Sequence, residues 1–281
     1  MGLVDYPQPY VVFMPMIPWL CRTVHAGGDY IILKTLHLTS EVATGLAPIA
    51  PRLWLSTALT VVFAALGWAV RGVTSAGALA GALACFALLL GTGVGGFAAL
   101  LMVFVVTWIT TRIGYARKQK LGTAEARTGR GALQVLANLG VASAVALAFA
   151  TVWPDRRMLV AVGAALSEAA ADTVSSEIGQ AAGAIPRLVT TWERAAPGTD
   201  GAVSFAGTLA GTAAAVILGL TCALTRVLPW HSLAISSGAG VAGMFLDSFL
   251  GATLERKGRL GNNAVNFFST AIAALAGFLL A

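Results

Sequence analysis

Long apolar stretches recur along the chain, and the polar residues cluster between them. Each stretch has about 20 residues, the length of a helix that crosses the hydrocarbon core of a bilayer. Apolar and polar positions do not alternate within them, as they would in the strands of a transmembrane barrel. The expected spans are 53–70, 76–91, 94–111, 132–152, 158–178, 202–225, 232–254 and 263–281. The pattern predicts an all-α, polytopic transmembrane helix bundle of about 7–8 spans, the lower count applying if 76–91 is only half inserted.

The composition agrees with a membrane protein and excludes several other classes. Only 11% of the residues are charged, whereas soluble proteins carry about 25%, and the mean hydropathy is +0.81. The 3 histidines form no zinc-binding pattern, and the chain lacks the P-loop motif of soluble nucleotide-binding domains. We expect no nucleic-acid partner.

The beginning of the chain differs from the rest. Several prolines interrupt it, and it has no basic segment ahead of a clean apolar core, so it does not resemble a signal peptide. We interpret residues 1–50 as a re-entrant or surface segment and residues 51–281 as a single transmembrane helical domain.

Basic residues are distributed unequally between the two sides of the predicted bundle. With eight spans, 12 lie on one side and 4 on the other. Cytoplasmic loops carry the excess of Lys and Arg, so the side that contains the loop 112–131 is predicted to be cytoplasmic. The expected location is a prokaryotic inner or plasma membrane.

Glycines mark one turn and several close contacts between helices. The segment Gly91–Gly96 separates the second and third spans and predicts a tight turn at one membrane face. Pairs of glycines four residues apart allow two helices to approach closely. Such pairs are Gly77/Gly81, Gly91/Gly95 and Gly207/Gly211.

Four carboxylates lie inside the predicted spans. Glu168, Asp172 and Glu177 fall within ten residues of the fifth span, and Asp247 lies in the seventh. An ionised carboxylate at the centre of a bilayer costs about 2.5–3.5 kcal/mol even on lenient scales. This density of acids in apolar helices predicts a functional site that holds a cation.

The residues around Asp172 favour magnesium as that cation. At 100° per residue, Glu168, Asp172, Ser175 and Ser176 share one helix face, while Glu177 points away from Asp172. Carboxylate and hydroxyl oxygens are ligands that Mg²⁺ prefers. The alternative is that these groups bond to neighbouring helices or pair with an arginine.

The seventh span repeats part of this pattern. Asp247-Ser248 corresponds to Asp172-Thr173, so that two Asp-hydroxyl pairs on separate helices are expected to face each other across one metal ion. Glu255, the residue directly after this span, is either a further ligand or a solvated helix end.

Basic and amide side chains gather on the same predicted face. Cationic residues and glycines in the loop 112–131 are of the kind that wraps phosphates. Topology and attraction to anionic lipids also explain that charge, so the amides Gln134 and Asn138, which enter a span and need partners, are more informative. The same face receives the polar starts of the sixth and eighth spans, at Ser204, Asn262 and Asn263.

These motifs resemble those of an integral-membrane prenyl-phosphate kinase family, which includes plant phytyl-phosphate kinase and animal transmembrane protein 19. The resemblance covers about residues 52–281 and depends on five blocks in order. The blocks are Gly122…Arg130…Gln134-Val-Leu-Ala-Asn138, Ala169-Ala-Ala-Asp172-Thr…Ser176-Glu177-Ile-Gly179, Gly201-Ala-Val-Ser204…Gly207-Thr208, Gly243…Asp247-Ser248…Gly251-Ala…Glu255-Arg256, and Asn262-Asn263…Asn266. Glu168, ahead of the second block, departs from the family pattern. The family is also distantly similar to CTP-using membrane enzymes such as dolichol kinase and CDP-diacylglycerol synthase.

The resemblance implies phosphorylation of an isoprenoid monophosphate, of the phytyl or geranylgeranyl type, to the diphosphate. The implied phosphoryl donor is a nucleoside triphosphate, with CTP favoured, and the cofactor is Mg²⁺. We assign catalysis and metal binding to Asp172, Glu177 and Asp247. The residues expected to bind nucleotide or prenyl phosphate are Lys118, Arg127, Arg130, Gln134, Asn138, Ser176, Ser204, Ser248, Arg256, Asn262 and Asn263.

Other functions fit the same residues. Acids inside spans and a repeated Asp-hydroxyl element also suit a cation-coupled secondary transporter with internal repeats. A membrane cytidylyltransferase that makes a CDP-lipid would release pyrophosphate, whereas a kinase that uses CTP would release CDP. A non-catalytic scaffold is the remaining alternative.

Overall fold

The computed structural model describes residues 50–281. The predicted re-entrant or surface segment 1–50 therefore lies almost wholly outside the described residues. Residues Thr60–Ala281 form one compact unit, and every contact and cavity discussed below lies within it.

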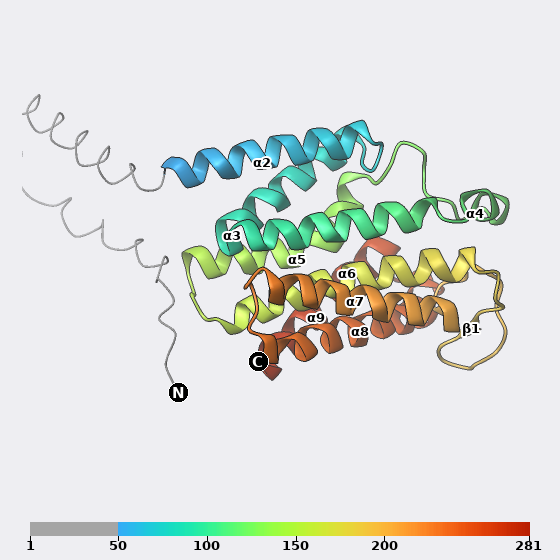
Figure 1. The fold of residues 1–281 in the computed structure, drawn as a ribbon. Helices are drawn as coiled ribbons and strands as arrows, with labels where there is room; N and C mark the ends of the chain where they lie inside the picture. The colour runs from blue at the N-terminus through green and yellow to red at the C-terminus, as the bar shows by residue number, and fades with distance from the viewer. Residues whose placement is uncertain (1–49) are drawn as a thin grey trace, which may run out of the picture. The chain divides into compact units, whose positions relative to one another are not determined.

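The described chain is almost entirely helical, which confirms the predicted fold class (Figure 1). Its helices are α2 (Ala50–Ala69), α3 (Ser75–Arg112), α4 (Tyr115–Leu121), α5 (Ala132–Thr151), α6 (Arg157–Ala181), α7 (Phe205–Leu224), η1 (Trp230–Ser232), α8 (Leu233–Leu250), η2 (Gly251–Glu255) and α9 (Asn262–Leu280). Two short strands, β1 (Arg187–Leu188) and β2 (Ala202–Val203), pair antiparallel in the loop before α7. Within residues 50–281, 6 helices are long and apolar enough to cross a membrane, and α2 has a shorter apolar part.

α3 folds back on itself at Gly93, whose φ of 64° and ψ of −155° interrupt the helix. A straight helix of 38 residues would be about 57 Å long. However, α3 starts directly after the 70–74 segment, and Arg112 at its other end donates to the Val70 carbonyl at 2.9 Å. The halves therefore run antiparallel, which confirms the predicted turn. The two halves of α3 correspond to the second and third expected spans. Together with α2 and the later long helices, they account for all eight expected positions.

α6 is the central helix of the bundle and contacts α3, α5, α7, α8 and α9. In its most apolar stretch 83% of the residues are buried, against 33% to 44% in the other five long helices. This burial has a physical reason. α6 is the least apolar of the six, and its polar groups avoid lipid by facing other helices.

Most of the predicted glycine contacts are present. A Cβ atom on Gly211 of α7 would lie 2.6 Å from the Ala171 carbonyl oxygen, and one on Gly207 would lie 2.5 Å from that of Ser175. These glycines let α7 pack directly on the backbone of α6. Gly81 is the exception, because a Cβ atom there would meet nothing within 4 Å.

Gly91→Ala is expected to destabilise the bundle by about 1–3 kcal/mol, the usual cost of overpacking. The added Cβ would lie 2.1 Å from the Ala146 carbonyl oxygen of α5, and a backbone atom cannot move aside without separating the helices. Thermal unfolding in detergent measures the effect. Gly140→Ala is the matched control, since its Cβ would meet nothing within 4 Å; equal losses in both variants would contradict the interpretation.

Candidate functional site: two cavities beside a pair of aspartates

Asp172 of α6 and Asp247 of α8 face each other. Their carboxyl groups lie within hydrogen-bonding range, and the charge of Asp172 acts on Asp247. Two facing carboxylates repel unless a proton or a cation lies between them. The expectation that acids from two separate spans meet in one place is confirmed.

Polar groups of α9 hold Asp247 in place. Ser269 Oγ donates to Asp247 Oδ2 at 3.2 Å. The Asn266 amide, oriented so that both of its polar atoms have suitable partners, donates to the same oxygen at 3.3 Å and to the Asn262 carbonyl at 2.9 Å. These contacts place Asp247 on the side of α8 that faces α6 and α9.

Glu168 lies deeper in the bundle, one helical turn before Asp172. It is 1% exposed, and Thr270 Oγ1 donates to its Oε2 at 2.6 Å, while its Oε1 has no hydrogen-bond partner among the described residues. Glu168 lies within electrostatic range of both aspartates, yet the described residues contain no group of three His, Cys, Asp or Glu side chains arranged to hold one metal ion.

Both aspartates line a polar cavity of about 140 Å³, here called the acidic cavity. Glu255 and Asp200 also line it, so the cavity carries four carboxylates. Its wall includes four residues that were predicted to bind substrate: Ser176, Ser204, Ser248 and Asn262. Residues from the ends of α6 and α8, the loop before α7 and the start of α9 therefore line one cavity.

Local structure explains how the loop before α7 reaches this cavity. Ser204 is the N-cap of α7, and its Oγ accepts from the Gly207 amide at 3.1 Å. Gly201 has a left-handed φ of 73°, and a Cβ atom there would lie 2.3 Å from the Ala252 amide nitrogen. The loop therefore packs on η2, a π-helix of the kind that often occurs at functional sites. The predicted sixth span, 202–225, corresponds to α7, which starts at Phe205 because Ala202 belongs to β2 and pairs with β1.

A second cavity, of about 350 Å³, lies between α2, α3, α5 and α6 and is here called the apolar cavity. Four arginines line it: Arg71, Arg112 and Arg127, which are exposed, and Arg130, which is half-buried. The end of the cavity at these arginines is here called its mouth. Its interior is lined by apolar residues that include Phe63, Leu100, Phe104 and Leu139. A cationic mouth above an apolar interior matches an amphiphile with an anionic head group and a hydrocarbon tail.

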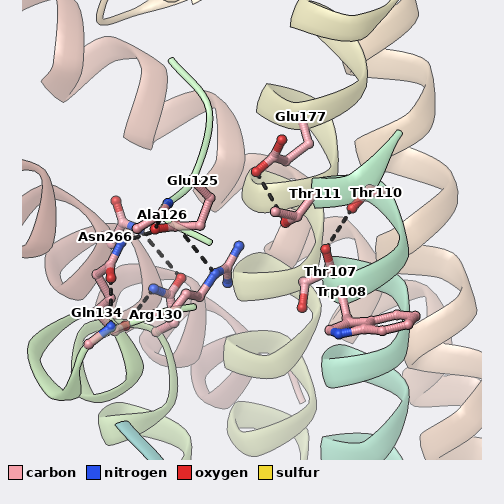
Figure 2. A network of polar contacts seen from close by, with 12 residues as sticks. Thr107, Trp108, Thr110, Thr111, Glu125, Ala126, Arg130, Gln134, Glu177 and Asn266 are labelled. Atoms are coloured by element: carbon pink, nitrogen blue, oxygen red, sulfur yellow. Dashed lines mark hydrogen bonds and ion pairs between the residues drawn. The ribbon is translucent and has the colours of Figure 1, made fainter. Parts of the chain in front are cut away.

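A polar network fixes Arg130 at this mouth (Figure 2). Glu125 Oε2 lies 3.9 Å from Arg130 Nε and accepts from Gln134 Nε2 at 3.2 Å. Gln134 Oε1 in turn accepts from the Gly131 amide at 2.8 Å, which caps the start of α5. Gln134 and Asn138, both predicted to bind substrate, line the apolar cavity.

The linings of the two cavities are linked through the amides of Asn138 and Asn266, and the charge of Arg130 acts on Asp172. Arg130 lines the apolar cavity and lies within electrostatic range of Asp172, which lines the acidic cavity. The amides of Asn138 and Asn266 lie 3.4 Å apart, so they extend from one cavity towards Asp247 in the other. Groups bound in the two cavities would therefore be neighbours.

Lys118 and Glu177 form a buried ion pair away from the aspartates. Lys118 is 0% exposed, and its Nζ bonds to Glu177 Oε2 as well as to the carbonyls of Thr110 at 3.1 Å and Thr111 at 2.8 Å. These bonds occupy all three donor positions of an ammonium group. Thr111 Oγ1 donates to the other oxygen of Glu177 at 3.1 Å, and Figure 2 shows Thr111 and Glu177 apart from Arg130.

Two site assignments are corrected by this ion pair. Lys118 was expected to bind phosphate and Glu177 to bind metal with Asp172 and Asp247. Each instead has the other as its partner, because Glu177 lies on a different side of α6 from Asp172 and faces the junction of α3 and α4.

Three further predicted residues lie at the margins of the site. Arg127 is exposed at the mouth of the apolar cavity, with its guanidinium 5.7 Å from the centre of the Tyr115 ring. Arg256 is exposed after η2, and Asn263 is half-buried in the first turn of α9. Arg256 and Asn263 line neither cavity, and their roles remain predictions.

Sequence reasoning missed several residues that support the site. Ser269 and Thr270 donate to the buried acids Asp247 and Glu168. Two adjacent hydroxyl residues within an apolar span could have indicated this, because such groups need hydrogen-bond partners in a membrane. Glu125 was missed because it lies in a polar loop, where a carboxylate has no need of a buried partner. Arg71 was counted only among the basic residues that set the predicted orientation, and Arg112 only as a member of the basic loop 112–131.

The carboxylates of Asp172 and Asp247 can supply part, but not all, of the ligands of a magnesium ion. Mg²⁺ is usually held by one or two carboxylates together with substrate phosphates, not by a cage made wholly of protein. Asp172 and Asp247 supply two such groups beside an open polar cavity. The donor set therefore fits a Mg²⁺ ion that arrives with a polyphosphate.

The fold and the site together define a polytopic α-helical membrane protein with a polar site at one end of its central helices. The chain belongs to the family described as Integral membrane protein DUF92, which matches residues 58–274. This confirms the predicted family.

Three of the relatives come from an archaeon and a plant. A membrane protein of Methanocaldococcus jannaschii, described as uncharacterized, is 32% identical over 82% of this chain and 94% of its own length. Protein PGR of Arabidopsis thaliana is 32% identical over 58% of this chain and 65% of its own length. The chloroplastic protein VTE6 of the same plant is 29% identical over 75% of this chain and 66% of its own length. No solved structure matches the chain.

Proposed function

We propose that this protein is a membrane kinase that converts an isoprenoid monophosphate, of the phytyl or geranylgeranyl type, to the diphosphate. The phosphoryl donor is a nucleoside triphosphate, with CTP favoured by the resemblance in the sequence motifs. The observation that carries the proposal is that an apolar cavity with a cationic mouth and an acidic cavity are linked through the neighbouring amides of Asn138 and Asn266, the second of which bonds to Asp247.

The apolar cavity takes the acceptor. An isoprenoid chain is dissolved in the bilayer, so its phosphate reaches the protein at the membrane surface. The tail enters the cavity between Phe63, Leu100 and Leu139, and the phosphate remains among the arginines of the mouth. Arginine suits this role because its planar guanidinium binds phosphate oxygens in pairs.

The acidic cavity takes the terminal phosphates of the donor. Its volume of about 140 Å³ is below that of pockets that enclose a whole small ligand, about 300–1,000 Å³, so the base and ribose lie outside it. Asp172 and Asp247 would hold Mg²⁺, which when bound neutralises charge on the phosphates. Ser204 and Ser248 supply hydroxyl donors beside them.

The chain's own residues need only position the reactants. An oxygen of the acceptor phosphate attacks the terminal phosphorus of the donor, a new P–O bond forms, the bond to the bridging oxygen breaks, and the nucleoside diphosphate leaves. The acceptor oxygen is already anionic at neutral pH, so no general base is required. Phosphoryl transfer depends mainly on positioning and charge neutralisation. Arg130, which lines the apolar cavity and acts electrostatically on Asp172, is the residue we assign to neutralising the phosphate groups.

Purified protein in nanodiscs is expected to form a prenyl diphosphate from geranylgeranyl monophosphate, Mg²⁺ and CTP, with CDP as the second product. The physical reason is that the two cavities bring the phosphate groups side by side. Liquid chromatography with mass spectrometry detects both products, and the other triphosphates test donor choice.

Two outcomes of this assay would contradict the kinase. Pyrophosphate release with formation of a CDP-lipid would identify a cytidylyltransferase. Ion-driven uptake of a solute into proteoliposomes, without any prenyl diphosphate, would identify a transporter.

A further inference from the structure

Gly81 is unlike every other glycine in the described part of the chain. It is buried within the first half of α3, yet a Cβ atom there would meet nothing within 4 Å. The other glycines with equally open space, such as Gly140 and Gly238, are not buried. Gly81 therefore faces an internal void, and it lines the apolar cavity.

Helix packing does not explain a glycine at this position. Gly77, one turn earlier, is required because a Cβ atom there would lie 2.3 Å from the Arg130 carbonyl oxygen. No such neighbour exists at Gly81. Glycine makes a helix less stable than alanine does, because glycine gives the unfolded chain more conformational freedom. Alanine or a larger residue is therefore expected at a helix position where no neighbour requires glycine. The space beyond Gly81 therefore belongs to the apolar cavity and is not required for helix packing.

The direction of the helices places Gly81 below the arginines. α3 starts at the mouth, where the Thr74 amide donates to the Arg130 carbonyl at 3.0 Å. Gly81 follows seven residues later, about 10 Å along the helix. Leu100 precedes Arg112 by twelve residues in the second half of α3. At the same rise per residue, it lies about 18 Å from the mouth along the helix. Gly81 therefore lies about halfway down the cavity wall.

We infer that Gly81 sets the longest isoprenoid chain that this protein accepts, an inference that rests on the proposed function. The tail of a bound prenyl monophosphate passes over Gly81 towards Leu100, in space that any side chain at residue 81 would occupy. A longer side chain there closes the lower half of the cavity and leaves the mouth unchanged. The chain length accepted should then fall as the side chain grows.

Gly81→Ala and Gly81→Leu form a graded pair that tests this inference. The Cβ atom of either variant would meet nothing within 4 Å, and the rest of the leucine side chain has the cavity to occupy. Gly140→Leu is the matched control, since Gly140 also has open space but lies on α5 outside the cavity. Each variant is assayed with geranyl, farnesyl and geranylgeranyl monophosphate.

Gly81→Leu is expected to lower turnover of the geranylgeranyl substrate relative to geranyl by about tenfold or more, the discrimination that apolar pockets achieve for added methylene groups. Gly81→Ala should show a smaller shift in the same direction, and Gly140→Leu none. An unchanged ratio in Gly81→Leu, or an equal shift in Gly140→Leu, would overturn the inference.

A second measurement separates this inference from the proposed function. The rise in unfolding temperature on adding each prenyl monophosphate alone reports binding and needs no triphosphate or turnover. If wild type forms no diphosphate but gains stability from geranylgeranyl monophosphate, and Gly81→Leu loses that gain while Gly140→Leu keeps it, the kinase proposal fails and the role of Gly81 stands. If no prenyl monophosphate stabilises the wild type, the role of Gly81 fails.

Discussion

Asp172→Asn is expected to lower the rate of prenyl diphosphate formation by about a hundredfold to a thousandfold, the usual loss when a group that stabilises developing charge is removed. Asparagine has the same shape as aspartate but no charge, so it holds a divalent cation poorly. The fold should survive, because the new amide is able to donate to Asp247, which faces it. Product formation at saturating Mg²⁺ measures the loss, and unfolding temperature checks the fold.

Asp155→Asn is the matched control for this substitution. Asp155 lies in the loop before α6, roughly 25 Å from Asp172 along the helix. Its partner is Arg157, whose guanidinium donates to it at 2.6 Å and lowers the pKa of the Asp155 carboxyl. An exposed pair of this kind contributes little to stability, so the variant should keep full activity. An Asp172→Asn protein as active as Asp155→Asn would refute the assignment of Asp172 to the site.

Lys118→Met is expected to destabilise the protein by about 3–5 kcal/mol, the cost of leaving one member of a buried ion pair without its partner. The substitution leaves the Glu177 carboxylate with Thr111 Oγ1 as its remaining donor. It also removes the bonds that Nζ makes to the last turn of α3. Unfolding temperature in detergent, followed by size-exclusion chromatography, reports the loss.

A double variant and a surface control identify the cause of that loss. Lys118→Met combined with Glu177→Gln removes both charges, so it should be more stable than Lys118→Met alone, because an isolated buried charge is the main penalty. Lys120→Met lies on the exposed side of the same short helix and should change little. If the double variant is as unstable as Lys118→Met, charge pairing is not the source of the effect.

The apolar pattern alone determined the helical bundle and the positions of its segments. The reason is that a bilayer forces every backbone polar group to be satisfied within its own helix, so spans can be recognised from local sequence. The same reasoning predicted that Asp172 and Asp247 meet, since charged groups in apolar helices face the bundle interior. The turn near Gly93 followed from the glycines around it.

Only the tertiary structure decided how the polar side chains are paired. Glu177 and Asp172 are five residues apart on one helix, but one bonds to Lys118 and the other faces Asp247, because each side of α6 meets a different neighbour. Pairing of this kind depends on the order of helices around α6, which periodicity does not encode. The open space at Gly81 was hidden for the same reason: a glycine that packs against a backbone and one that borders a cavity look identical in a sequence.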